Sequence, residues 1–218
     1  MSPSTLLTVM VSGLLALAAW SRLAELHRKA ALARAARARG LRFEDHAGRF
    51  IVGGPGKLPV LRLGGAVGRY LVTDGTLAVF EHLARGPSAT AWRPLAAARV
   101  TGVPAFRLEA RRPGVLGLAA AVFTPDDEVG LDVPDFDERY QLFADDRVTA
   151  RGLFTDPVVA FFVARPGFCL EVRGDWLVVE EGLGPLDPAA LSAQLDGLRA
   201  LVTLLERAAA TARGDDRA

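Results

Sequence analysis

Residues 168–181 read FCLEVRGDWLVVEE, and this stretch decides the class of fold. Two apolar runs flank the pair Gly174-Asp175, which is typical of a two-residue hairpin turn with glycine first. Such a turn joins antiparallel strands, because parallel neighbours need a much longer connection. The stretch therefore predicts a β-hairpin in which Trp176 is a packing aromatic and Cys169 a small buried strand residue.

The chain after the hairpin predicts an amphipathic helix that reaches about Arg213. Asp187 can cap its N-terminus, and Pro188 suits the first helical position. Apolar residues then recur at spacings of three and four: Leu191, Leu195, Leu198, Leu201, Val202 and Leu205. We expect this face to pack on the sheet. A partner-binding coiled coil is the alternative, but a sustained heptad is missing.

The segment before the hairpin, residues 135–146, reads DFDERYQLFADD. Tyr140, Leu142 and, less strictly, Phe136 alternate with polar residues, which predicts a strand with one buried face. Asp145 or Asp146 can cap a helix that begins near Arg147. A second short helix is predicted from Thr155-Asp156-Pro157 to Arg165.

Earlier apolar runs, set off by Gly and Pro, predict further strands at residues 49–52, 58–63, 69–74, 77–83, 97–102 and 105–110. Residues 53–58, GGPGKL, lack the spacing of a phosphate-binding loop and are interpreted as a turn. Residues 114–123 are too short to span a bilayer and predict a buried helix or strand, with a shallow membrane contact as the alternative. The expected class is α+β: a mainly antiparallel sheet, in one or two parts, with short helices and the C-terminal helix packed on it.

The N-terminal segment has no charged side chain before Arg22, and residues 6–20 are its apolar centre. Basic residues follow it: Arg22, Arg28, Lys29, Arg34, Arg37, Arg39 and Arg42. Because positive residues stay in the cytoplasm, we expect a single-pass helix in the cell membrane, with the N-terminus outside and the body cytoplasmic. A cleaved signal peptide, with a cleavage site near residues 16–18, is less favoured because its charge normally precedes the apolar region. A buried core helix is the third alternative.

These patterns predict a transmembrane anchor at residues 1–21 and a basic juxtamembrane helix at 22–40 that ends at Gly40. A cytoplasmic domain at 41–213 and a disordered tail at 214–218 follow, and a chain that begins near residue 41 is expected to fold. Residues 4–21 would contact membrane lipid. Anionic headgroups would lie near Arg22, Arg28, Lys29 and Arg34, each adding about 1 kcal/mol of attraction.

The sequence favours no catalytic chemistry. The net charge of +1 argues against a nucleic-acid partner, and a single cysteine allows no internal disulfide. Residues 126–146 carry nine carboxylates but fit no calcium loop and contain no histidine. We therefore assign no catalytic, cofactor-binding or metal-ligating residue and expect no cofactor. The favoured function is a non-enzymatic, cytoplasmic-side interaction or scaffold module that binds another protein, of unknown identity, or the membrane surface. The alternatives are a hydrolase that uses carboxylates around 132–138, and a lipid or small-molecule sensor with an apolar cavity between sheet and terminal helix.

One ordered set of motifs carries a resemblance. The set is Phe136-Asp137, Tyr140, Asp145-Asp146, Ala150-Arg151 and the step at residues 153–157, followed by the hairpin and the amphipathic helix. The chain resembles an uncharacterised family of bacterial single-pass membrane-anchored proteins, a domain of unknown function, most strongly over residues 106–205. The resemblance implies an architecture and no reaction or ligand. It also implies that the acidic stretch is a signature of the fold.

Overall fold

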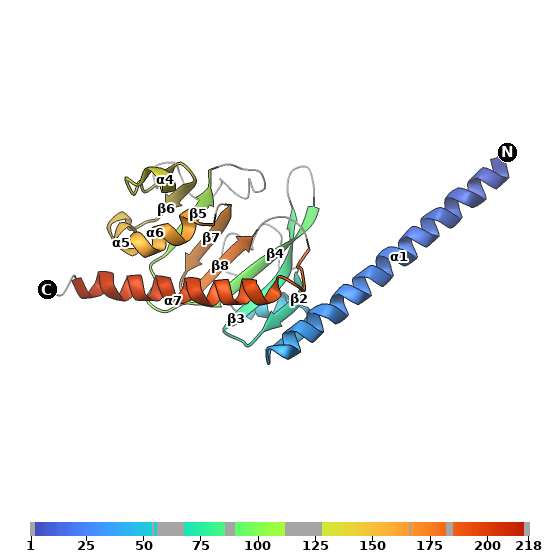
Figure 1. Ribbon diagram of the computed structural model, residues 1–218, viewed down its shortest axis with the longest axis horizontal. Coiled ribbons are helices and arrows are strands. Elements are labelled where there is room, and N and C mark those ends of the chain that lie inside the picture. Colours follow the sequence, from blue (N-terminus) through green and yellow to red (C-terminus); the bar gives the residue numbers. More distant parts are fainter. Residues whose placement is uncertain are drawn as a thin grey trace.

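An eight-stranded antiparallel sheet forms the centre of the computed structural model (Figure 1), which describes residues 3–53, 55, 68–85, 90–111, 128–165, 167–181 and 185–215. The strands are β1 (Arg42–His46), β2 (Gly68–Thr73), β3 (Leu77–Arg85), β4 (Thr90–Arg99), β5 (Phe106–Ala110), β6 (Tyr140–Phe143), β7 (Phe168–Arg173) and β8 (Trp176–Glu181). The helices are α1 (Pro3–Ala38), α2 (Gly48–Gly53), α4 (Pro134–Asp137), α5 (Arg147–Leu153), α6 (Asp156–Val163) and α7 (Leu191–Asp215). The α+β class is confirmed.

The predicted hairpin is β7–β8, and it joins the two halves of the sheet. Arg173 pairs with Trp176 across the turn, and Gly174 has a φ of 62°, which explains why glycine stands there. The strand order is β1-β2-β3-β4-β8-β7-β5-β6. The sheet is therefore continuous, and the possibility of two separate parts is wrong. Strand β4 ends at Arg99, so the strand predicted at residues 97–102 lies further toward the N-terminus than expected.

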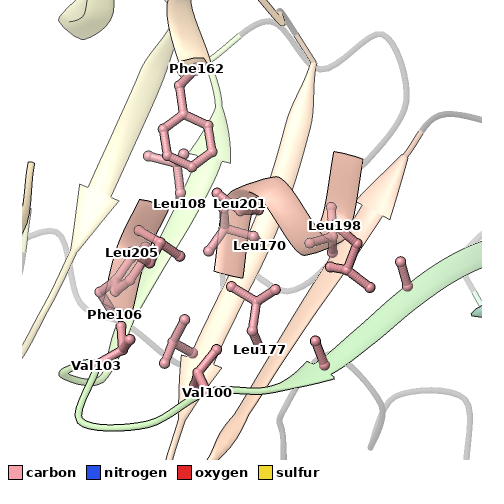
Figure 2. Close-up of a cluster of buried hydrophobic side chains, with 14 of the residues drawn as sticks. Val100, Val103, Phe106, Leu108, Phe162, Leu170, Leu177, Leu198, Leu201 and Leu205 are labelled. Carbon is pink, nitrogen blue, oxygen red and sulfur yellow. The ribbon is translucent and has the colours of Figure 1, made fainter. Parts of the chain in front are cut away.

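Helix α7 covers one face of the sheet, as its apolar stripe predicts. Leu191, Leu195, Leu198, Leu201 and Leu205 are all buried. Figure 2 shows the stripe residues Leu198, Leu201 and Leu205 beside side chains of the strands. The regular helix begins at Leu191. Asp187 starts a preceding turn, in which its carboxylate accepts a hydrogen bond from the Ala189 N–H at 2.9 Å.

The opposite face of the sheet carries a smaller apolar core under α2. Residues 49–52 belong to this helix, so the strand expected there is wrong. A helical turn places both Phe50 and Ile51 against the sheet, whereas a strand would direct neighbouring side chains to opposite faces. Phe50 packs edge-on against Trp176, with ring centres 5.3 Å apart. Trp176 is thus confirmed as a packing aromatic.

The acidic stretch forms a helical turn and then a strand. Phe136 lies in α4, so its expected place in the strand with Tyr140 and Leu142 is wrong, although all three are buried. The turn is closed by the Asp137 carboxylate, which accepts hydrogen bonds from the N–H of Leu131 at 3.3 Å and of Val133 at 3.0 Å.

Both predicted short helices of this region are present. Asp146, of the two candidates, caps α5 by accepting a hydrogen bond from Thr149 N–H at 3.0 Å. Thr155 precedes α6, which ends at Val163. The predictions for residues 58–63 and 114–123, most of the turn at 53–58 and the end of the tail lie outside the described residues.

Helix α1 is one unbroken helix that runs from outside the domain into its core (Figure 1). Gly40 ends it with a φ of 69°, while Leu41 N–H bonds Ala36 O and Gly40 N–H bonds Arg37 O, each at 3.0 Å. This pattern is a Schellman motif, in which only glycine adopts the left-handed conformation at little cost. The predicted stop at Gly40 is confirmed.

Candidate functional site

The first part of α1 makes no packed interface with the domain. Its described large apolar side chains are exposed: Leu6, Leu7, Val9, Met10, Val11, Leu14, Leu15, Leu17, Trp20, Leu23 and Leu26. The stretch from Val9 to Ala38 is long enough, and over eighteen residues apolar enough, to cross a membrane, and that window is not buried in the protein. The alternative of a buried core helix therefore fails for this part of α1.

The second part of α1 is built into the domain. Leu32 and Ala36 are fully buried in the core that α7 and the sheet share. One and two turns before Leu32, Arg28 and Glu25 lie on the same side of the helix. This placement brings two charged side chains of α1 against the start of β2 and the middle of β3. We call the group Glu25, Arg28, Arg69, Tyr70 and Glu81 the helix–sheet junction.

Glu81 is the centre of the helix–sheet junction. Its side chain has no solvent exposure, and Arg28 Nη1 donates to its Oε1 at 2.5 Å. Arg69 Nε donates to Oε2 at 2.6 Å. The backbone N–H of Leu186, in the segment before α7, donates to Oε1 at 2.6 Å. One carboxylate thus joins α1, β2, β3 and the chain entering α7.

Glu25 completes the junction on the outer side. Arg69 Nη1 lies 2.9 Å and Arg28 Nη2 3.0 Å from its Oε1, and the Tyr70 hydroxyl also donates to this oxygen. Partial burial pushes the pKa of Glu25 upward, but the bonds from Tyr70 and Arg28 outweigh it, so the pKa lies below its ordinary value. Burial likewise opposes the charge of Arg28, but its bonds to Glu81 and Glu25 leave its pKa raised. Two carboxylates and two guanidinium groups balance, which suits a structural connection.

The basic residues predicted to face lipid headgroups divide into two groups. Arg22 and Arg34 are exposed. Arg28 belongs to the helix–sheet junction, and Lys29 Nζ lies 2.6 Å from Asp45 Oδ2. The basic helix therefore serves partly to hold the domain, since Arg39 also forms a paired contact with Asp196 at 2.7 Å through each terminal nitrogen.

Within residues 128–146, which the structure describes, the carboxylates are spread over separate structural contacts and the exposed surface. Asp132, Asp135 and Glu138 are exposed, and Asp132 pairs with Arg151 at 3.2 Å. Asp137 closes the turn described above, and Asp146 caps α5. This arrangement argues against the hydrolase alternative. Among the described ranges, no group of three or more His, Cys, Asp or Glu residues is placed to hold a metal ion.

The motifs behind the resemblance serve packing. Phe136 lies within 5.5 Å, between ring centres, of both Tyr140 and Phe154. The Tyr140 hydroxyl donates to the Arg165 carbonyl after α6. FD-x-x-Y therefore joins α4, β6 and α6, as expected for a signature of the fold.

A cleft of about 510 Å³ lies at the end of the domain where α7 finishes. Its walls come from α5, α7 and the loop between β4 and β5, and they include Val103, Val148 and Leu153. Val148 is 82% exposed, and Arg213 at the rim donates to the carbonyl of Gly102. The sensor alternative expected a cavity between sheet and α7; this cleft lies instead between α7 and α5.

A second charged group lies on the sheet face opposite α7. Arg93 Nη1 donates to Glu180 Oε1 at 2.9 Å, and Cys169 is paired with Glu180 across β7 and β8. Burial raises the pKa of Glu180 to about 7, because it outweighs the attraction of the Arg93 charge, which alone would lower the pKa. Burial also raises the pKa of Glu109 and of the Cys169 thiol. A protonated, half-buried thiol on a strand fits the structural role predicted for Cys169.

We predict that Glu180 makes stability depend on pH. Between its ordinary pKa of 4.5 and about 7 the folded chain holds a proton that the unfolded chain releases, so stability falls as pH rises through this window. In Glu180→Gln, urea midpoints measured from about pH 5 to about pH 8 should fall less steeply than in the unmodified chain. Glu138→Gln, at an exposed position, is the control. Equal slopes for Glu180→Gln and the unmodified chain would refute the prediction.

Sequence reasoning missed the helix–sheet junction. Arg28 and Glu81 are 53 positions apart, so no local pattern joins them. One signal was present: Glu81 follows Leu77 and Val79 at alternate positions of a strand, which places a carboxylate on an apolar face. Such a carboxylate needs a cation from another element.

No protein-family model and no curated protein matches the chain. Among solved structures, the crystal structure of the mycobacterial trehalose monomycolate transport factor A, TtfA, has a similar fold. The TM-score is 0.57 at 15% identity, and the likeness covers 82% of this chain and 94% of that one. The comparison shows the fold alone. It therefore supports the resemblance described above for the fold, and not for a membrane anchor.

Proposed function

We propose that the protein is a single-pass membrane anchor with a non-enzymatic interaction domain on the cytoplasmic side. The observation that carries this proposal is the unbroken helix α1, which is apolar and exposed in its first part and packed into the core in its second. The absence of positive charge before the apolar part, and its abundance after it, favour a cytoplasmic domain.

The partner we propose is a protein of the same membrane that takes part in transport. TtfA is described as a transport factor, and we extend only that general role to this chain. Anionic headgroups are expected near the exposed Arg22 and Arg34. The surfaces of the domain, and not a reaction site, would carry the role.

The test is a pair of C-terminal fusions to the full chain, one to alkaline phosphatase and one to green fluorescent protein. We expect fluorescence and no phosphatase activity, with the chain in the carbonate-resistant membrane fraction and its first residues intact by mass. An active phosphatase fusion, or a mature chain lacking the apolar segment, would contradict the proposal.

The interaction role has its own control. In a matched variant, residues 3–23 are replaced by an unrelated single-pass helix of equal length. A partner that binds the domain should be captured by cross-linking to the unmodified chain and to the variant alike. Capture by the unmodified chain alone would place the contact in the membrane segment.

A further inference from the structure

The apolar surface of α1 continues past the point where the helix first touches the domain. Leu23 and Leu26 are 50% and 62% exposed, and they flank Glu25, which is already bonded to the sheet. At this level one side of α1 faces the domain while the other still presents leucine. The membrane-facing part of the helix and its docked part therefore overlap along the axis.

This overlap brings the domain close to the bilayer. With a rise of 1.5 Å per residue, Glu25 lies about 7.5 Å and Arg28 about 12 Å along the helix from Trp20. The headgroup region on each side of the hydrocarbon core is roughly 5–8 Å thick. If Trp20 marks the edge of the hydrocarbon core, the first contact of the domain lies at the level of the headgroups.

Beside the helix–sheet junction, the sheet presents a partly exposed tryptophan, Trp92, in contact with the same Arg69 that bonds Glu25. The guanidinium carbon of Arg69 lies 4.2 Å from the centre of the Trp92 ring and 4.9 Å from that of Tyr70. Trp92 stands on β4 opposite Leu83 of β3, and neither is fully buried. In Figure 1, α1 leaves the domain beside the half of the sheet that contains β2, β3 and β4.

A tryptophan under a guanidinium group matches the chemistry of a lipid headgroup layer. The indole ring is apolar with one N–H donor, which favours the boundary between hydrocarbon and water. Arg69 keeps a quarter of its side chain exposed beside the ring, and the exposed Arg22 adds positive charge nearby on α1. Phosphate groups complement the charge of Arg22, and they can also accept from the exposed part of Arg69, whose charge is shared with Glu25 and Glu81.

We propose that Trp92, with Arg69 stacked on it, rests in the headgroup layer of the bilayer that α1 crosses. This second contact rests on the proposed function, since it needs α1 to span the membrane. It fixes which end of the sheet faces the lipid and leaves the cleft near Val148 on the side away from it. The occupant is lipid, so the contact requires no other protein.

The three tryptophans of the chain provide the test. Trp176 is 6% exposed and stays in every variant as the internal reference. The full chain is placed in lipid nanodiscs as Trp20→Phe, as Trp92→Phe and as the double variant. Emission is compared with a spin label on the lipid headgroup and with one deep in the acyl chain.

The Trp20→Phe variant keeps Trp92. We expect the headgroup label to quench its emission much more than that of the double variant. The acyl-chain label should quench the two variants equally. Trp92→Phe keeps Trp20 in the membrane helix. Its emission should be quenched by lipid labels whether or not Trp92 contacts the headgroups. Equal quenching of Trp20→Phe and the double variant would overturn the headgroup contact but leave the anchor intact. Failure to quench Trp20 would overturn the proposed function itself.

Discussion

A chain that begins at Leu41 is expected to unfold or aggregate, whereas one that begins at Ala24 is expected to fold. The first chain lacks Leu32 and Ala36, which are fully buried, and leaves Glu81 without Arg28. Loss of one buried leucine side chain costs about 2–5 kcal/mol. Breaking the buried Arg28–Glu81 pair, which leaves Arg69 as the remaining cation on Glu81, costs up to about 3–5 kcal/mol more. Together these terms approach the whole stability of a domain, about 5–15 kcal/mol.

The two chains can be compared by size-exclusion chromatography and by urea unfolding followed by circular dichroism. A chain from Ala24 with Leu32→Ala is the intermediate case, and it should fold with reduced stability. Cooperative unfolding of the Leu41 chain at the same midpoint as the Ala24 chain would refute the prediction. The sequence expectation of an independent domain from residue 41 would then stand.

Glu81→Gln is expected to lower the free energy of unfolding by about 3–5 kcal/mol, because it removes the buried carboxylate that Arg28 and Arg69 share and leaves them only the more exposed Glu25. The amide keeps the shape of the side chain, so the loss reports charge and hydrogen bonding and not a cavity. Arg28, Arg69 and Leu186 N–H would each lose a charged acceptor.

The matched control for Glu81→Gln is a second ion pair between α1 and the sheet. Lys29 and Asp45 form an ion pair at 2.6 Å, but their side chains are 39% and 49% exposed. Asp45→Asn should therefore cost less than about 1 kcal/mol. Both variants are measured by urea unfolding of the full chain in detergent micelles. A loss no larger for Glu81→Gln than for Asp45→Asn would show that the junction is not a stabilising centre.

Local signals made much of the fold predictable. The Gly174-Asp175 turn, the leucine stripe of α7, the stop at Gly40 and the cap at Asp146 each depend on residues a few positions apart. Residues 49–52 were misread because a short apolar run fits a strand or a helix equally well. Phe136 was misplaced because the bonds of Asp137 that close its turn run to backbone groups, which the sequence does not display.

The helix–sheet junction was not predictable in this way. The bonds that tie α1 to the sheet join residues more than forty positions apart, and only the folded topology of β2 and β3 brings Arg69 and Glu81 to α1. The excess of arginine after the apolar segment was interpreted as a signal for orientation in the membrane. Part of that charge also neutralises carboxylates of the domain, as Arg28, Lys29 and Arg39 show.

The straight run of α1 into the core has a mechanical consequence. Because Glu81 ties this helix to the start of α7, a change in the inclination of one requires the other to follow. Helices in bilayers tilt by about 20°, and the 25 residues of α7 extend about 37 Å at 1.5 Å per residue. A reorientation of that size would carry the far end of α7, with the cleft beside Arg213, through roughly 13 Å. If α1 spans a bilayer as we propose, a small change in its tilt would therefore be amplified at the far end of α7.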